Sequence, residues 1–452
     1  MTPNRLSYTE ALAALESRGR FGIHLGLSRT RALLAGLGNP ERRFRGVLIA
    51  GTNGKGSVHA LVASAIVAAG YRVGQTPKPH LVTYRERLQI GGVPVDVDTF
   101  ARLTDEVLAI SDRVARRHGE PTEFELLTAI TFLWFAESGI DLAVVEVGLG
   151  GRLDATHAWD GGVAAVTNVS LDHMDRLGDT VEAIAKEKAA IIMRGDLAVT
   201  GASGSPLEIV RRRSRRVAVP LTVVEPARLI AADRAGIEVE LGQLGPVRIG
   251  LRGRHQAANA AVADAILDAL AAADIAIVHD PARRAGYASV QWPGRLELVE
   301  VEGRDVLLDG AHNPAGAVTL ATALDELGPL LKPGRATLVL AIMADKDVDG
   351  VIGPLAASNF LREARVICTA PTGGRALPAE RLAARWRALA GRPAEAIAAP
   401  AAALDAALSS ESGSGPVVVA GSLYLVGAAR AILVSDPLLV PDPPIPQTQK
   451  VP

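Results

Sequence analysis

A glycine-rich loop between an apolar run and a helix-like stretch carries the clearest chemical signal in the chain. It comprises Gly51, Thr52, Asn53, Gly54, Lys55, Gly56 and Ser57. Glycines let backbone N–H groups turn around an anion, and the helix that follows directs its positive end at the same place. Lys55 adds a charge for a β- or γ-phosphate, and the Ser57 hydroxyl suits a magnesium ion. Gly56 separates Lys55 from Ser57, so the strict GxxxxGK-Ser/Thr pattern fails and a purely structural glycine turn remains the alternative.

Polar residues near the ends of two apolar runs are candidate magnesium ligands. Glu146 lies in the run 142–147, where a buried carboxylate needs a partner or a metal ion. Asp172 and His173 follow the next run, and open α/β sheets bind their ligands at such strand ends. Imidazole is not a favoured magnesium ligand. From spacing alone, His173 is therefore as consistent with an ordinary loop histidine as with a metal ligand.

One lysine falls on the apolar face of a predicted helix. Lys188 lies four residues after Ile184 and three before Ile191, whereas Lys186 lies off that face. Burial would lower the pKa of the Lys188 ammonium and leave a neutral, nucleophilic amine. The alternative is a lysine that reaches solvent or pairs with a neighbouring acid.

The elements that must position these residues are short apolar runs that alternate with helical patterns. The runs are continuous in Val, Ile and Leu, which is typical of strands covered on both faces. They span residues 47–50, 142–147, 163–169, 306–309, 337–342, 365–369 and 416–420. This alternation predicts an α/β protein with a mainly parallel sheet.

The pattern restarts near residue 296, after a loop and a hairpin-like pair, which predicts two domains. We expect the first domain at residues 1–294 and the second at 295–435. Residues 436–452 are rich in proline and are expected to be extended or disordered.

The bulk composition excludes several classes of protein. The 452 residues hold 48 Lys and Arg against 49 Asp and Glu, which argues against non-specific nucleic-acid binding. Cys368 is the single cysteine, so there is neither an intrachain disulfide framework nor a cysteine-based zinc cluster. The sequence has no apolar run of transmembrane length and no signal-peptide pattern, and we expect a cytoplasmic protein that binds no membrane.

Taken together, the motifs resemble the folylpolyglutamate synthase/dihydrofolate synthase family of the Mur ligase superfamily. The matching strings follow the family order from about residue 25 to residue 430 and read LGLSRTRALLAGLGNPE, IAGTNGKGS, ERLQIGG, TEFELLTA, EVGLGGRLDAT, TNVSLDHMDRLGDT, IAKEKAAII, LRGRHQAANA, PGRLE, LDGAHNP, DKD and GSLYLVG. The resemblance implies a P-loop-type ATP-binding domain with a mainly parallel sheet, followed by a smaller Rossmann-like ligase domain. It also implies an ATP-dependent amide ligase that adds L-glutamate to a folate-type carboxylate through an acyl phosphate.

The resemblance also implies roles for individual residues. The loop Gly51–Ser57 would hold the ATP phosphates, and the catalytic residues would be Lys55, His173, Lys188 and His312. One or two Mg²⁺ ions would be bound by Ser57, Glu146, His173 and Lys188, the last as a carbamate. Further nucleotide contacts would come from Asn259, Arg295 and Asp309. The substrate pocket would draw on Leu25, Gly26, Leu27, Ser28, Arg29, Lys78, His80, Thr122, Phe124, Leu153, Asp154, Ala155, Lys346 and Ser422.

Two departures from the family pattern bear on the acceptor and the metal count. The family usually reads Thr-Ser-Pro-His-Leu where this chain has TPKPHL, so Lys78 stands near the place of a metal-binding serine, while His80 remains. The lysine either supplies the positive charge itself or leaves the site with one metal ion fewer. His157 replaces the asparagine that usually follows the DAT string.

Two other interpretations stay open. The same ATP chemistry could serve a non-folate acceptor such as a peptidoglycan precursor, although the 50 residues before Gly51 leave little room for a nucleotide-sugar domain. A non-catalytic nucleotide-binding regulator would be expected to lack the charged residues at the site, and these are present. The expected partners are ATP, L-glutamate and dihydropteroate or tetrahydrofolate polyglutamates, bound by a monomer.

Overall fold

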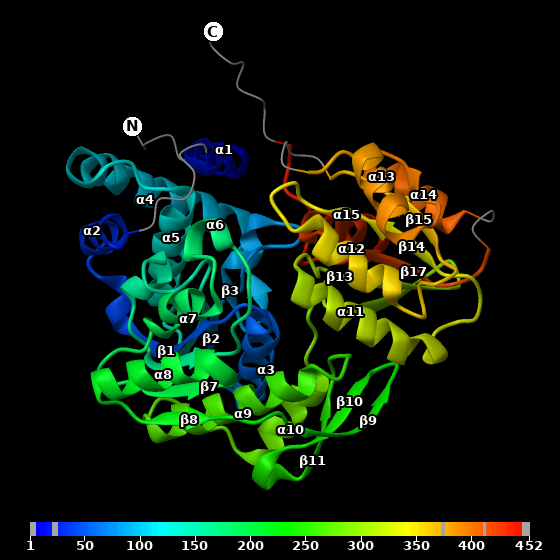
Figure 1. Ribbon diagram of the computed structural model, residues 1–452. Coiled ribbons are helices and arrows are strands. Elements are labelled where there is room, and N and C mark those ends of the chain that lie inside the picture. Colours follow the sequence, from blue (N-terminus) through cyan, green and yellow to red (C-terminus); the bar gives the residue numbers. More distant parts are fainter. Residues whose placement is uncertain (1–5, 20–25, 372–375, 410–412, 445–452) are drawn as a thin grey trace. The chain divides into compact units, whose positions relative to one another are not determined.

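The protein forms two compact units, shown in the computed structural model of Figure 1. The structure describes residues 6–19, 26–371, 376–409 and 413–444. Within this part of the chain, the first unit comprises residues up to 226 together with 261–286 and those from 441. The second unit comprises residues 227–260 and 287–440.

An eight-stranded sheet forms the centre of the first unit. Its strands are β1 (Arg45–Ala50), β2 (Val73–Thr76), β3 (Gln89–Ile90), β4 (Val93–Pro94), β5 (Leu142–Glu146), β6 (Gly162–Val166), β7 (Leu197–Thr200) and β8 (Leu221–Val223). The order is β4-β3-β2-β5-β1-β6-β7-β8, and only the β4-β3-β2 edge is antiparallel. Strand β1 therefore lies between β5 and β6, in the middle of the parallel part.

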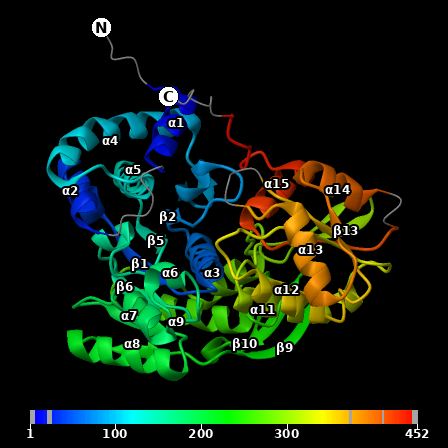
Figure 2. The same ribbon diagram turned by 45° about the horizontal axis from the view of Figure 1, so that its top comes forward.

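Helices cover both faces of this sheet. They are α1 (Tyr8–Gly19), α2 (Ser28–Gly36), α3 (Lys55–Ala68), α4 (Val97–His118), α5 (Glu123–Ser138), α6 (Met174–Leu177), α7 (Val181–Ala189) and α8 (Gly204–Val217). Helices α1, α2, α4 and α5 lie side by side and share one core with Leu48 and Ala50 of β1 (Figure 2). Val47 and Ile49, which alternate with them, are also fully buried. The strand is thus apolar throughout because neither face meets water.

The second unit contains two sheets. A small antiparallel sheet has the order β11-β10-β9, from β9 (Arg228–Asp233), β10 (Gly236–Glu240) and β11 (Pro246–Ile249). The larger sheet consists of β12 (Glu297–Val301), β13 (Arg304–Asp309), β14 (Thr337–Leu340), β15 (Arg365–Cys368), β16 (Glu395–Ala396) and β17 (Val417–Ala420). Its order is β12-β13-β17-β14-β15-β16, and all neighbours are parallel except β12 and β13.

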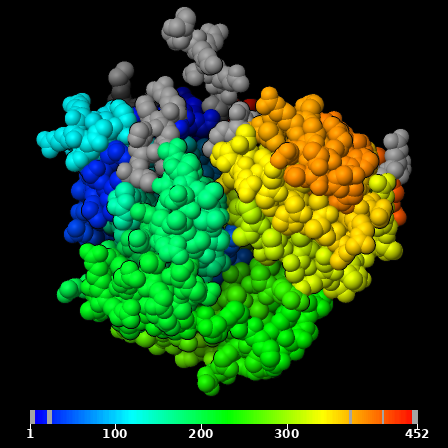
Figure 3. Space-filling model, viewed as in Figure 1, coloured from blue at the N-terminus to red at the C-terminus, as the bar shows by residue number. Residues whose placement is uncertain are grey.

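Five helices flank the larger sheet of the second unit. They are α11 (Pro314–Leu327), α12 (Val348–Ala357), α13 (Ala379–Ala390), α14 (Pro400–Leu408) and α15 (Leu423–Leu433). The orange residues, which include α13 and α14, lie on the surface of this unit (Figure 3). Two further helices, α9 (Gln256–Ala272) and α10 (Asp280–Ser289), each begin in one unit and end in the other.

The predicted α/β architecture with mainly parallel sheets is confirmed, and each of the seven predicted apolar runs overlaps a strand. The domain boundary between residues 294 and 295 remains a prediction, because the compact units divide differently and place β9–β11 with the larger sheet. Residues 436–444 of the tail form neither helix nor strand, and there the Asp442 carboxylate accepts hydrogen bonds from Tyr8 and Thr83, while the prediction for residues 445–452 lies outside the described residues. None of the helices within the described ranges is both long and apolar enough to span a bilayer.

Candidate active site

The glycine loop joins β1 to α3 at the carboxyl edge of the parallel sheet. Gly54 caps the helix with a φ of 79°, in the left-handed region where glycine is favoured, and α3 begins at Lys55. The first turn of a helix presents N–H groups that the helix itself does not use, and its dipole is positive there. The structure therefore contains the strand, loop and helix that an anion site at Gly51–Ser57 requires.

Residues that follow β6 hold the loop from one side. The Asn53 N–H donates to Oδ1 of Asn168 at 3.0 Å, and the Thr167 hydroxyl donates to the Asn53 carbonyl at 2.7 Å. A Cβ atom on Gly51 would lie 1.9 Å from Oγ1 of Thr167, so only glycine fits. Sequence reasoning missed Thr167 and Asn168, although polar residues directly after a buried run were an available signal.

Two ammonium groups converge on the same loop carbonyl. Nζ of Lys55 donates to the carbonyls of Gly51 and Thr52, both at 3.0 Å, and Nζ of Lys188 donates to the Gly51 carbonyl at 2.9 Å. Both lysine side chains therefore lie against the loop that would face the expected phosphates.

Lys188 lies on the buried face of α7, next to the fully buried Ile184, while Lys186 is exposed. Burial, and to a smaller extent the nearby Lys55, lowers the pKa of Lys188 to about 7, although Asp172 and Asp154 oppose the shift. A substantial neutral fraction of the Lys188 amine therefore exists near pH 7.

Lys78 lies against two residues that the sequence assigned to the site. Its backbone N–H donates to Oε2 of Glu146 at 3.1 Å, and its Nζ donates to the Glu146 carbonyl at 2.7 Å. The same Nζ lies 5.0 Å from the centre of the Phe124 ring, a cation–π distance. Burial lowers the pKa of Lys78 to about 8, against the attraction of Asp154 and Glu146.

The Asp154 carboxylate organises the turn that follows β5. It accepts the backbone N–H groups of Gly148 at 3.0 Å and Leu149 at 2.8 Å, and the Thr156 hydroxyl at 2.6 Å. A Cβ atom on Gly148 would meet the Phe124 ring at 2.7 Å, so the aromatic ring packs directly on this turn.

The remaining first-unit residues of the predicted substrate pocket fall into three groups. In the first group, the Leu153 carbonyl accepts the Gly26 N–H at 3.4 Å. Gly26 is followed by Leu27 and Ser28 at the start of α2, and Ala155, two residues after Leu153, is buried. Arg29 pairs with the Glu125 carboxylate, which also accepts the Thr122 N–H and which sequence reasoning missed. His80 accepts a hydrogen bond from Arg87 and His157 contacts the Arg152 carbonyl, while Leu25 lies outside the described residues.

The predicted magnesium ligands do not form a preformed cage. Ser57 is buried in the first turn of α3, and Glu146 ends β5. The His173 side chain is substantially exposed, and its Nε2 lies 3.8 Å from Oδ1 of Asp172. Across the described ranges, no three His, Cys, Asp or Glu side chains cluster so that they could bind a metal ion. These residues still fit Mg²⁺, because that ion usually takes few protein ligands and completes its shell with phosphate oxygens and water.

A second group of predicted residues gathers at the carboxyl ends of β13 and β17. The Asp309 carboxylate accepts the N–H groups of Leu296 and Ala311, both at 2.9 Å, and burial raises its pKa while Arg295 opposes the shift. His312 contacts the Gly310 carbonyl at 2.8 Å, and the buried Ser422 follows β17. Lys346 lies in the loop that follows β14.

The Asn259 side chain lies in the first turn of α9, in the second unit. Its Nδ2 donates to Oε1 of Gln256 at 2.8 Å, and Asn259 is 7% exposed. Gln256 is a further residue that sequence reasoning did not single out.

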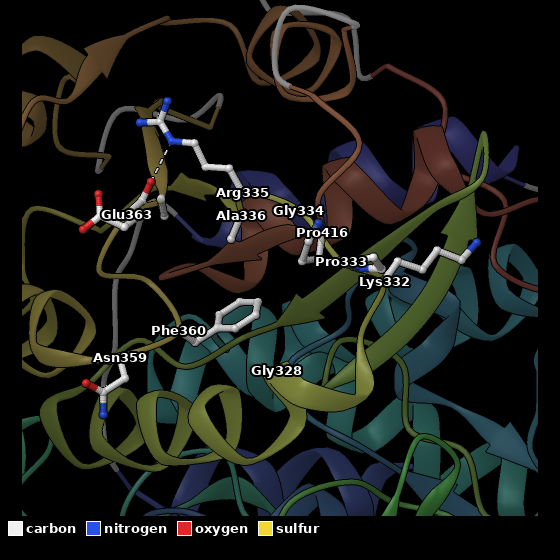
Figure 4. A pocket seen from close by; sticks show the side chains of 11 residues that line it. Gly328, Lys332, Pro333, Gly334, Arg335, Ala336, Asn359, Phe360, Glu363 and Pro416 are labelled. Carbon is white, nitrogen blue, oxygen red and sulfur yellow. Dashed lines mark hydrogen bonds between the residues drawn. The ribbon is translucent and has the colours of Figure 1, made fainter.

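A pocket of about 330 Å³ in the second unit is a separate feature (Figure 4). Its lining includes Phe360 together with Ala336, Ala364 and Pro416, which directly precede β14, β15 and β17. It therefore lies at the amino ends of these strands, whereas Asp309 and Ser422 lie at carboxyl ends, and it does not belong to the candidate active site.

Comparisons with known proteins identify two domain families in this chain. The Mur ligase middle domain family matches residues 49–267, and the Mur ligase, glutamate ligase domain family matches residues 294–423. A dihydrofolate synthase/folylpolyglutamate synthase of Bacillus subtilis is 35% identical over 76% of this chain and 82% of its own length. The protein of that name from Mycobacterium tuberculosis is 35% identical over 92% of this chain and 91% of its own length.

Solved structures show the same relationship. The Mycobacterium tuberculosis folylpolyglutamate synthase complexed with ADP and AMPPCP has a TM-score of 0.84 and 32% identity, covering 94% of this chain and 100% of that one. Escherichia coli FolC in complex with DHPP and ADP has a TM-score of 0.78 and 29% identity, covering 93% of this chain and 97% of that one. The chain therefore belongs to the dihydrofolate synthase/folylpolyglutamate synthase family of the Mur ligases.

Proposed function

We propose that this chain is an ATP-dependent ligase that joins L-glutamate to a folate-type carboxylate. The observation that carries the proposal is the convergence of Lys55 and Lys188 on the Gly51 carbonyl, within a strand–loop–helix anion site. The relatives named dihydrofolate synthase and folylpolyglutamate synthase supply the class of acceptor and the amine.

The reaction would proceed in two substitutions. An oxygen of the acceptor carboxylate attacks the γ-phosphorus of ATP, ADP leaves, and an acyl phosphate forms. The amine of glutamate then attacks the acyl carbon, phosphate leaves with the bonding electron pair, and the amine loses a proton. Such chemistry needs positioning and charge neutralisation more than covalent help from the protein.

Each group of residues would have a distinct task in this reaction. The loop Gly51–Ser57 and Lys55 would orient the phosphates, and the helix start of α3 would offset their negative charge. The turn organised by Asp154, together with Phe124, would position the acceptor. Asn259, Arg295 and Asp309 would hold the nucleoside, and His312, Lys346 and Ser422 would contact nucleotide or glutamate.

Mg²⁺ would neutralise charge on the transferred phosphoryl group. Ser57 offers a hydroxyl and Glu146 a carboxylate for such an ion, with His173 as a further ligand. A carbamate on Lys188 would add an oxygen ligand, and the buried, partly neutral amine supports that modification. We also propose that the protein acts as a monomer in the cytoplasm.

The ammonium of Lys78 would replace one cation at this site. It donates to the carbonyl of Glu146, whose carboxylate is also bound by the Lys78 N–H. A fixed positive charge there disfavours a second metal ion beside Glu146 and attracts a carboxylate acceptor. This arrangement supports an enzyme that works with one ion of Mg²⁺.

The variant Lys78→Ser tests this substitution of a cation. Without the ammonium, we expect the half-saturating Mg²⁺ concentration to rise roughly tenfold, a typical coupling between neighbouring charged sites. Mg²⁺ titration of ligase activity, together with calorimetric Mg²⁺ binding in the presence of a non-hydrolysable ATP analogue, measures the change. Lys186→Ser serves as the matched control because Lys186 is exposed on α7. An unchanged Mg²⁺ requirement would remove Lys78 from this role.

The proposed activity is tested by product analysis. The full chain is incubated with ATP, L-glutamate and one acceptor at a time: dihydropteroate, tetrahydrofolate or its monoglutamate. Mass spectrometry should show acceptors extended by glutamate, with ATP turnover that requires both acceptor and glutamate. Turnover with a peptidoglycan precursor alone would identify the non-folate ligase, and ATP binding without turnover on any acceptor would identify a regulator.

A further inference from the structure

Three side chains at the start of α9 are joined by hydrogen bonds, and the last of them is the predicted nucleotide contact Asn259. Nδ2 of Asn259 donates to Oε1 of Gln256 at 2.8 Å, and Nε2 of Gln256 donates to Nε2 of His255 at 3.1 Å. Gln256 and Asn259 are three residues apart on the helix, so their side chains lie on the same face. Gln256 is 1% exposed, and its amide is therefore held inside the protein.

The direction of these hydrogen bonds follows from the Gln256 amide, whose Nε2 can only donate and whose Oε1 can only accept. Burial lowers the pKa of His255 to about 4, so the ring is neutral near pH 7 and one of its nitrogens accepts while the other carries the proton. Nε2 accepts from Gln256, which places the proton on Nδ1. Nδ1 is enclosed and has no hydrogen-bond partner in the part of the chain that the structure describes.

The ring of His255 is itself fixed by close packing. A Cβ atom on Gly253 would lie 2.6 Å from Cε1 of the ring and 2.9 Å from Cδ1 of Leu296. Leu296 in turn donates its N–H to Asp309, another predicted nucleotide contact. The His255 ring and Leu296 therefore both lie close to Gly253, beside the predicted nucleotide contact Asp309.

The Asn259 amide is left with a defined pattern of unused groups. One N–H is used by Gln256, while Oδ1 accepts no hydrogen bond from any residue that the structure describes. An acceptor and one donor therefore remain. Adenine presents the complementary pair, an exocyclic amino group beside a ring nitrogen that accepts, and asparagine binds that edge through two hydrogen bonds.

We propose that His255 and Gln256 are positioning residues that hold the Asn259 amide in the orientation that selects adenine. This inference rests on the proposed nucleotide contact of Asn259. If the amide could rotate freely, its Nδ2 could turn to donate to a base that carries an oxygen in place of the amino group, which would regain one of the two hydrogen bonds. The fixed amide excludes that base because two acceptors would then face each other.

The test compares binding of ATP and ITP to the full chain by calorimetry, each as its Mg²⁺ complex and without acceptor. ITP has the same ribose and triphosphate and carries an oxygen where ATP carries the amino group, so the ratio of the two dissociation constants reports the base edge alone. The wild-type chain should prefer ATP roughly tenfold or more, the range that a two-bond amide contact provides. Gln256→Leu, which keeps the size but neither hydrogen bond, should reduce the preference to about threefold or less.

Three further variants separate a loss of hydrogen bonding from a loss of folding. Gln256→Glu retains the acceptor for Nδ2 of Asn259 and should restore most of the ATP preference, which a purely structural role would not predict. His255→Phe fills the place of the ring without accepting from Gln256, and it should lower the preference if Gln256→Leu fails to fold. Asn259→Ala should abolish the preference. Thermal unfolding of each variant reports whether the fold is intact.

The outcomes separate the inference from the proposed function. A wild-type chain that binds neither nucleotide contradicts the proposed ligase. Retained ATP preference in Asn259→Ala overturns the role of Asn259 and with it the positioning by Gln256. Loss of preference in Asn259→Ala, with full preference in both Gln256→Leu and His255→Phe, overturns the positioning role alone.

Discussion

Replacing Lys55 with alanine is expected to lower kcat/KM for ATP by at least about a hundredfold, the effect of removing one charged or hydrogen-bonding group from a transferring phosphoryl centre. Lys55 begins α3 and its Nζ already bonds to two carbonyls of the glycine loop, so it is close to where the phosphates would lie. The side chain is only partly buried, and its removal should cost little packing. Steady-state kinetics with acceptor and glutamate at saturation measure the loss.

The control for this variant is Lys186→Ala, which removes an exposed lysine of α7. Its activity should match the wild type, and both variants should unfold within a few degrees of it in a thermal scan. Wild-type turnover by a folded Lys55→Ala chain would show that the loop does not hold the reacting phosphates.

Replacing Lys188 with alanine is expected to cause the second large loss of turnover, again about a hundredfold or more. The buried Nζ lies 2.9 Å from the Gly51 carbonyl, so the substitution removes a group that contacts the phosphate loop and leaves a space behind it. If the lysine acts as a carbamate, a small carboxylate such as acetate should enter this space and restore part of the activity. The same concentration of acetate should leave the Lys55→Ala and Lys186→Ala variants unchanged.

The pH dependence of the modification has a definite sign. Burial lowers the pKa of Lys188 to about 7, and only the neutral amine combines with carbon dioxide. Stimulation of the wild-type chain by bicarbonate should therefore grow as the pH rises through 7 and disappear as it falls below that value. Nuclear magnetic resonance with isotopically labelled bicarbonate would detect the carbamate. Absence of the signal together with no rescue by acetate would rule out the modification.

Local patterns in the sequence were sufficient to predict the buried strands and helices near the site and which of their side chains point inward. The apolar run 47–50, followed by the glycine loop, predicted the strand, turn and helix that the structure shows, because both faces of that strand are buried. The helical spacing of Ile184 and Ile191 placed Lys188 inward, since positions three and four residues apart share a helix face.

Short or exposed elements were not predicted. Most of β9 is exposed, and β10 and β11 mix buried positions with half-buried or exposed ones, so these strands carry no continuous apolar signal. Their grouping with the larger sheet of the second unit depends on packing such as the ion pair between Arg234 and Asp305. A single boundary along the chain cannot describe a unit that combines residues 227–260 with residues 287–440.

The sequence by itself determined the phosphate loop, the α/β class and the family, because these depend on residues that are neighbours along the chain. Only the tertiary structure decided that Thr167 and Asn168 hold the loop, that Lys78 lies against Glu146 and Phe124, and that Gln256 directs the Asn259 amide. The first two follow from the strand order β2-β5-β1-β6, which brings residues from distant segments to one edge of the sheet. The third depends on side-chain hydrogen bonds within one helix turn, in which the Gln256 amide donates to His255 and accepts from Asn259.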